Sequence, residues 1–286
     1  MCRARTGSVE TVLALVAIVP SAPLLVPELA GPAATDTEPV RAAVRSVAKR
    51  LGSAADRWIA LGAADRAGSA GATDYRSCGD FGGYGVPHPV RLGGPPTEGA
   101  PLPLSMLIAG WVRGEADGGG ERITVTPWVV DPEWSPDQCA AAGLELARAL
   151  SDGGDPDSDD PHGGDPDSDD PDSGDRVGLL VVADGCTALS PGAPGGGERP
   201  SAIGLQRRID DALARADTGA LAALDADACA AEGVGGRAAW QVLAAACGGP
   251  AADVAVSDVA AAEVLYRDAP FGVGYTVAVW SPGAPR

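Results

Sequence analysis

The first long apolar stretch of the chain runs from Val12 to Val19 and is rich in β-branched residues. An apolar run of this length, ended by a proline that cannot donate to a β-ladder, predicts a strand buried on both faces. The loop Pro20-Ser21-Ala22-Pro23 follows it, at the carboxyl end of the predicted strand, where open α/β sheets bind their ligands. The two prolines fix φ on either side of Ser21, so we expect its hydroxyl to be held in place.

Predicted strands and helices alternate along the rest of the chain. Apolar runs predict further buried strands at 58–62, 123–130 and 177–185, and a last strand within 262–280. Apolar residues at three-to-four spacing predict helices at 37–51, 102–112, 136–150, 203–216 and 218–231, and another from 235 onward. Residues 67–100 are rich in Gly and Pro and predict a turn-rich loop. This order predicts an α/β fold with a mainly parallel central sheet and helices on both faces.

The length and composition fit a single domain. A chain of 286 residues with 45% hydrophobic residues can bury a sizeable core, which must be built from Ala, Val and Leu because aromatic residues make up only 4%. We expect one domain formed by residues 11–150 and 176–286, preceded by a disordered lead at residues 1–10. No segment approaches the length of apolar sequence that a membrane span needs, so no membrane partner is expected.

Residues 151–175 interrupt this pattern with a direct repeat of Gly-Gly-Asp-Pro-Asp-Ser-Asp-Asp-Pro, which starts at Gly153 and again at Gly163. Proline and like-charge repulsion predict a disordered acidic insertion. The repeat lacks the ligand spacing of a calcium loop, which leaves weak, diffuse cation binding as the alternative. Its eleven Asp residues contribute more than half of the net charge of −18. An acidic chain of this kind is not expected to bind nucleic acid or anionic membrane surfaces.

The six cysteines are scattered and show neither a metal-knuckle nor a redox spacing. Single cysteines of this kind are typical of reduced, semi-buried thiols in a cytoplasmic protein. A secretory signal is the alternative, because Arg3 and Arg5 precede the first apolar run. Glu10 between these charges and the run, and the continuation of the apolar pattern as far as Val26, favour a strand instead.

Several segments together resemble a known family. The loop Pro20-Ser21-Ala22-Pro23 and the tail Leu25-Val26-Pro27-Glu28 resemble the start of the B-type subunit of class III extradiol ring-cleavage dioxygenases and of the related Memo-like proteins. Those proteins read Pro-His-x-Pro followed by Leu-Val-Pro-Glu. With the Asp184-Gly185 turn, the helical segment 240–243 and the strand segment 269–275, the chain is similar to an actinobacterial branch of this B-type family. The resemblance covers nearly everything except residues 1–10 and 151–175, and it implies the same α/β fold.

The resemblance also implies where the iron ligands of these enzymes would lie, and this chain has no histidine there. Ser21 stands at the first ligand position, residues 64–66 (Ala, Asp, Arg) lie at the second, and the turn at Asp184 lacks the histidine that acts as catalytic base. The only two histidines are His88, in a Pro-flanked loop, and His162, in the acidic insertion. An Fe(II) site of this class needs two imidazoles and one carboxylate. We therefore expect no metal and no cofactor.

Two interpretations of function follow from the missing histidines. The first is a non-catalytic scaffold of the dioxygenase type that binds a small molecule, a partner subunit or a second copy of itself. The second is an active ring-cleavage oxidoreductase whose metal site is rebuilt or is completed by a partner subunit. A purely structural role in an assembly is a weaker third interpretation.

Four residues are candidates for the site. We expect Ser21, Asp65 and Asp184 to project from strand carboxyl ends into one crevice, an oxygen-rich set that suits Mg²⁺ or Mn²⁺ better than Fe(II). The alternative for each of them is a local capping role. Arg237 follows paired glycines at a predicted helix start, where it could bind an anionic ligand together with free backbone amides or pair with an acidic side chain.

Overall fold

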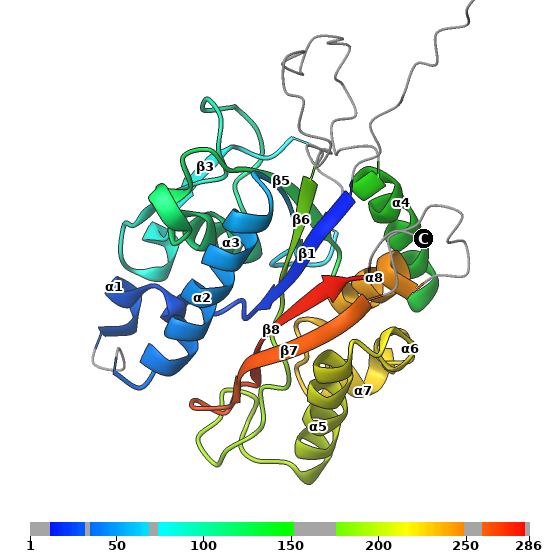
Figure 1. Ribbon diagram of the computed structural model, residues 1–286. Helices are drawn as coiled ribbons and strands as arrows, with labels where there is room; N and C mark the ends of the chain where they lie inside the picture. The colour runs from blue at the N-terminus through cyan, green and yellow to red at the C-terminus, as the bar shows by residue number, and fades with distance from the viewer. Residues whose placement is uncertain (1–11, 32–34, 69–73, 152–175, 249–258, 284–286) are drawn as a thin grey trace, which may run out of the picture.

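A central sheet of six strands organises the chain in the computed structural model (Figure 1). The structure describes residues 12–31, 35–68, 74–151, 176–248 and 259–283. The predicted lead and, apart from Ser151, the predicted acidic insertion lie outside the described residues. The strands are β1 (Val12–Val19), β2 (Arg57–Ala63), β5 (Thr124–Val130), β6 (Arg176–Val182), β7 (Val259–Asp268) and β8 (Tyr275–Pro282).

The order across the sheet is β5-β2-β6-β1-β8-β7. The first four strands in this order are mutually parallel, β8 is antiparallel to β1, and β7 is antiparallel to β8. This arrangement confirms the predicted α/β fold with a mainly parallel central sheet. Since the four parallel strands point the same way, their carboxyl ends share one edge of the sheet, and the antiparallel strand β8 begins at that edge.

Helices cover both faces of the sheet, as predicted (Figure 1). One face packs against α2 (Glu38–Ala54) and α3 (Leu104–Gly114), and the other against α4 (Pro136–Ser151), α5 (Pro200–Arg215) and α8 (Arg237–Gly248). Strand β6 shows why its sequence is apolar at nearly every position: Val181 faces the α4, α5 and α8 side while Val182 faces the α2 and α3 side, and both are buried. A strand covered on both faces has no solvent-facing position that would favour a polar residue.

Shorter elements complete the described chain. They are α1 (Pro27–Ala30), α6 (Thr218–Ala222), α7 (Ala226–Ala231), the 3-10 turns η1 (Pro23–Leu25), η3 (Gly82–Tyr84) and η4 (Asp117–Gly120), and a small antiparallel pair of strands, β3 (Cys78–Asp80) and β4 (Pro89–Arg91). The β3–β4 pair lies within the region predicted as a turn-rich loop and gives that region an ordered element. Within the described residues, no helix has both the length and the apolar character required to cross a bilayer.

Two predicted elements are wrong in extent. The helix expected over 218–231 is divided into α6 and α7, because the Asp225 carboxylate accepts a hydrogen bond from the Ala228 amide (2.7 Å) and starts a new helix there. The single strand expected within 262–280 is a hairpin of β7 and β8. The chain reverses between them at Gly272, whose φ of +74° is readily adopted only by glycine.

Candidate functional site

The structure brings together two of the predicted site residues where β1 and β6 end. The backbone amide of Ser21 donates a hydrogen bond of 2.7 Å to Oδ1 of Asp184, across the junction between the two parallel strands. Both residues are partly buried. The second carboxylate oxygen of Asp184 and the Ser21 hydroxyl make no hydrogen bond with any described residue. Two polar groups at this edge of the sheet are therefore available to a bound molecule.

The backbone around Asp184 is fixed from three directions. The Ala183 amide donates to the Val19 carbonyl (2.9 Å), and the Gly185 amide donates to the Gly274 carbonyl (2.9 Å). The carbonyl of Asp184 itself accepts from the Gly236 amide (2.8 Å), just before α8 begins. A Cβ at position 236 would lie 2.8 Å from this carbonyl oxygen, so the close approach requires glycine. These contacts hold the Asp184 side chain at the edge without using either of its carboxylate oxygens.

Tyr275 is a third member of this group that the sequence interpretation did not select. Strand β8 pairs with β1 through Ile18 and Ala278, and continuing this antiparallel register places Tyr275 opposite Ser21. Tyr275 is only 5% exposed, yet its hydroxyl has no hydrogen-bonding partner among the described residues. The hydroxyl oxygen itself is open to solvent, which leaves it available to a bound molecule. We call Ser21, Asp184 and Tyr275 the carboxyl-edge cluster.

The electrostatics of the cluster are dominated by a partly buried carboxylate. Burial raises the pKa of Asp184 from its ordinary value of 3.8 to about 7, and the hydrogen bond from the Ser21 amide opposes this rise only in part. Burial and, after it, the neighbouring Asp184 carboxylate raise the pKa of Tyr275. Among the described residues, no arginine, lysine or histidine forms an ion pair with Asp184. The cluster therefore carries an acid that no protein cation within this part of the chain compensates.

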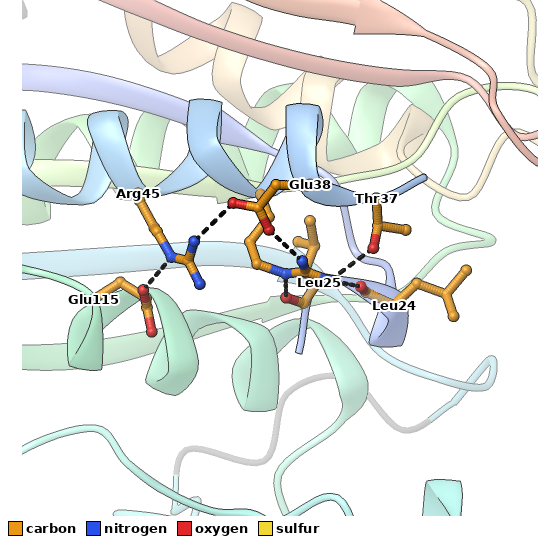
Figure 2. Close-up of polar contacts among 7 residues, drawn as sticks. Leu24, Leu25, Thr37, Glu38, Arg45 and Glu115 are labelled. Atoms are coloured by element: carbon orange, nitrogen blue, oxygen red, sulfur yellow. Dashed lines mark hydrogen bonds and ion pairs between the residues drawn. The ribbon is translucent and has the colours of Figure 1, made fainter. Parts of the chain in front are cut away.

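A buried arginine fixes the loop that carries Ser21. Arg41 of α2 is 2% exposed and donates from Nε to the Leu25 carbonyl (2.9 Å) and from Nη2 to the Leu24 carbonyl (3.3 Å). It also contacts Glu38, which pairs with Arg45 (Figure 2). Arg45 in turn donates a hydrogen bond of 2.8 Å from Nε to the carboxylate of Glu115, which directly follows α3. Because Leu24 and Leu25 follow the Ser21 loop directly, this network holds the loop against α2.

Asp65, the third expected member of the crevice, has a different contact. Its Oδ1 accepts a hydrogen bond of 2.9 Å from the Leu104 amide at the start of α3, and the residue is exposed. Its carboxylate contributes, after burial, to raising the pKa of Tyr75 and of Tyr84, which places both rings near it. The structure therefore gives Asp65 the capping contact that was the alternative at the sequence level, and no hydrogen bond joins it to Ser21 or Asp184.

Arg237 binds protein carbonyls instead of an acidic side chain. It is 6% exposed at the start of α8, and its guanidinium donates to the carbonyls of Pro132 (2.6 Å) and Trp134. A third hydrogen bond, of 2.9 Å, goes to Oε1 of Gln241 one turn along the helix. These contacts join α8 to the loop between β5 and α4. The guanidinium is thus occupied in packing, and Arg237 does not join the carboxyl-edge cluster.

The described residues do not fit the Fe(II) site that the resemblance implies. None of their His, Cys, Asp and Glu side chains gather in a group of three or more that could hold a metal ion. The two carboxylates nearest the expected ligand positions, Asp65 and Asp184, each accept a hydrogen bond from a backbone amide. A ferrous site of this class needs imidazole donors, and the cluster supplies only a carboxylate and two hydroxyls. We therefore assign no iron-dependent reaction to the carboxyl-edge cluster.

A groove in the described structure lies away from this cluster. It has a volume of about 500 Å³ and lies between α2 and the β7–β8 hairpin. Its cationic side chains are already paired, because Arg50 donates twice to Glu263 (2.7 and 3.2 Å) and Lys49 lies 3.6 Å from Asp117. We place the candidate site at the carboxyl-edge cluster, because uncommitted polar groups and a perturbed acid indicate a binding site more specifically than volume does.

Comparison with models of known protein families gives no match for this chain, and comparison with curated protein sequences gives none. The resemblance to the class III extradiol dioxygenases therefore stays a prediction from the motifs, and the function must be argued from the geometry of the carboxyl-edge cluster.

Proposed function

We propose that this chain is a protein of the class III extradiol dioxygenase type, similar to the B-type subunit of those enzymes. In this proposal it binds a small molecule at the carboxyl-edge cluster and does not open aromatic rings with iron. The observation that carries the proposal is the hydrogen bond between Ser21 and Asp184. It joins Ser21, which stands where the resemblance implies an iron ligand, to Asp184 in the turn that lacks the catalytic-base histidine. Around this contact the cluster keeps a free carboxylate oxygen and two hydroxyls, which suit ligand recognition through hydrogen bonds.

The position of the cluster supports the same proposal. Ligands of open α/β sheets bind beyond the carboxyl ends of the strands, and β1, β6 and the start of β8 meet there. The Tyr275 hydroxyl has no hydrogen-bonding partner among the described residues and is open to solvent, so a bound molecule can donate a hydrogen bond to it or accept one from it.

Two measurements on the purified full-length protein test the proposal. Elemental analysis and an assay of catechol opening address the chemistry, and thermal unfolding in the presence of a small-molecule library addresses binding. We expect no stoichiometric iron, no ring opening, and at least one compound that stabilises the wild type but not Asp184→Asn. Stoichiometric ferrous iron with ring opening by the chain alone would overturn the proposal and favour the rebuilt or partner-completed metal site.

We also propose the cytoplasm as the location of the protein. The cysteines within the described residues, Cys78, Cys139, Cys186, Cys229 and Cys247, are all free thiols. Free thiols persist in the reducing cytoplasm, whereas secreted proteins commonly oxidise theirs to disulfides. Fractionation of the native host, followed by detection of the protein in each fraction, tests this location.

A further inference from the structure

The carboxyl-edge cluster presents acceptor atoms and lacks a positive charge. Asp184 is partly buried without an ion-pair partner among the described residues, and Tyr275 has a hydroxyl without a partner there in a side chain that is only 5% exposed. Burial of an unpaired carboxylate is costly, and this cost appears as the raised pKa of Asp184. A cation placed beside the carboxylate would reduce that cost.

The number of free hydrogen-bond acceptors in the cluster indicates which class of cation would fit. Oδ1 of Asp184 already accepts from the Ser21 amide, which leaves one carboxylate oxygen. The hydroxyl oxygens of Ser21 and Tyr275 bring the free acceptors to three, on the ends of β1, β6 and β8. A primary ammonium group carries three N–H donors in a compact arrangement. A metal ion is a poorer match, because hard cations take six or more oxygen ligands, several of them carboxylates or carbonyls.

We propose that the carboxyl-edge cluster recognises the primary ammonium group of a small organic amine, with Asp184 as the counter-ion and Ser21 and Tyr275 as hydrogen-bond acceptors. This inference rests on the proposed small-molecule binding and names the ligand class. It requires the amine to enter as the cation and to form a charge-assisted hydrogen bond with Asp184, the strongest of the three contacts.

The probe for this proposal is benzylamine, compared with two analogues. Benzyl alcohol keeps the ring and loses the charge, and benzyltrimethylammonium keeps the charge and loses the N–H donors. Isothermal titration of the full-length protein at about pH 8.5, where Asp184 is ionised, is expected to show that benzylamine binds at least about 10-fold more tightly than either analogue. Lowering the pH to about 5.5 protonates Asp184 and is expected to weaken benzylamine binding by about 10-fold.

The effect of pH is assigned to Asp184 because the other polar groups near this edge of the sheet have partners of their own or stay neutral. Tyr275 faces Asp184 from β8, and its raised pKa keeps it neutral at both pH values. The Arg237 guanidinium, at the start of α8, is occupied by the carbonyls of Pro132 and Trp134. The carboxylate of Asp65, which follows the neighbouring strand β2, is exposed and bound to the Leu104 amide. Asp65→Asn is therefore the matched control.

Single substitutions test which side chains of the cluster bind the ammonium group. Asp184→Asn keeps an oxygen for the Ser21 amide but removes the charge, and it is expected to weaken benzylamine binding by about 30-fold. Tyr275→Phe is expected to weaken it by about 3- to 10-fold, and Asp65→Asn to leave it unchanged. If Asp184→Asn fails to fold, the Tyr275→Phe variant and the pH series on the wild type decide the question.

The outcomes separate this inference from the proposed function. Equal affinity for benzylamine and benzyl alcohol, or equal affinity of the wild type and Asp184→Asn for benzylamine, overturns the ammonium proposal and leaves small-molecule binding intact. Equal affinity for benzyltrimethylammonium overturns recognition through N–H donors. If benzylamine does not bind and no compound in the small-molecule library stabilises the wild type over Asp184→Asn, both proposals fail together.

Discussion

The backbone amide of Ser21 and the carboxylate of Asp184 are 163 residues apart in the sequence and are joined by a hydrogen bond of 2.7 Å. The bond exists because β1 and β6 are adjacent parallel strands that end at the same edge of the sheet. It fixes the carboxylate while leaving one of its oxygens free. Burial at this position raises the pKa of Asp184 to about 7, which makes the group responsive to pH in the neutral range.

The first prediction concerns stability and pH. Between pH 3.8 and about 7 the folded protein holds a proton on Asp184 that the unfolded chain has released, so this residue makes stability fall as the pH rises through that window. Asp184→Asn removes the effect. We expect the difference in free energy of unfolding, variant minus wild type, to be about 2–4 kcal/mol larger at about pH 8.5 than at about pH 4.

Urea unfolding at a series of pH values measures this difference, with Asp65→Asn as the control because that side chain is exposed. Parallel stability curves for Asp184→Asn and wild type would show that Asp184 is hydrated in the folded state.

The second prediction concerns the buried arginine behind the Ser21 loop. Arg41→Ala leaves the carbonyls of Leu24 and Leu25 without their donor and removes one of the two arginine partners of Glu38, so we expect a loss of about 3–5 kcal/mol in the free energy of unfolding. Arg45→Ala is the control, because that side chain is 36% exposed and its ion pairs are solvated. It is expected to cost less than about 1 kcal/mol. Similar losses for the two variants would contradict the role given to Arg41.

The third prediction concerns the contact between α4 and α8. A Cβ on Gly143 would lie 2.4 Å from the Cβ of Ala245 and 2.7 Å from the Val242 carbonyl, so Gly143→Ala is expected to destabilise by about 2 kcal/mol despite the better helix propensity of alanine. Gly204 in α5 has no atom within 4 Å of such a Cβ. Gly204→Ala is therefore expected to stabilise by up to about 1 kcal/mol. Calorimetry of both variants compares the two positions, and a stabilised Gly143→Ala would show that the helices can separate at no cost.

The fourth prediction concerns Asp65 as the cap of α3. Asp65→Ala removes the acceptor of the Leu104 amide and is expected to cost about 1 kcal/mol in the free energy of unfolding. Asp65→Asn keeps an acceptor oxygen and is expected to cost only a few tenths of that amount. Chemical unfolding of the two variants measures the difference. Equal losses would indicate that the charge of Asp65, and not its hydrogen bond, stabilises the start of α3.

The sequence alone predicted the strands that are buried on both faces, because such strands are continuous apolar runs whose pattern needs no tertiary information. It also predicted that Ser21 and Asp184 lie at one edge, since parallel strands end together. It missed Tyr275, because residues 262–280 were interpreted as one strand. Only the reversal at Gly272 shows that β8 starts beside the carboxyl ends of the parallel strands.

The capping contact of Asp65 and the carbonyl contacts of Arg237 depend on distant partners. Leu104 is 39 residues from Asp65, and Pro132 is 105 residues from Arg237. Local sequence patterns carry no information about such pairs, so the sequence left both a functional and a structural interpretation open. The division of 218–231 into α6 and α7 is different, because the aspartate that caps the second helix is a local signal visible in the sequence.

The most direct test of the account is to titrate the Asp184 carboxyl by carbon-13 NMR in the free protein and with saturating benzylamine. The account predicts a midpoint near pH 7 in the free protein, as burial requires, and a lower midpoint with benzylamine, because a neighbouring cation favours the ionised carboxylate. A midpoint near the ordinary value of 3.8, or one that benzylamine does not move, would contradict the claim that Asp184 is an uncompensated buried acid that binds an ammonium group.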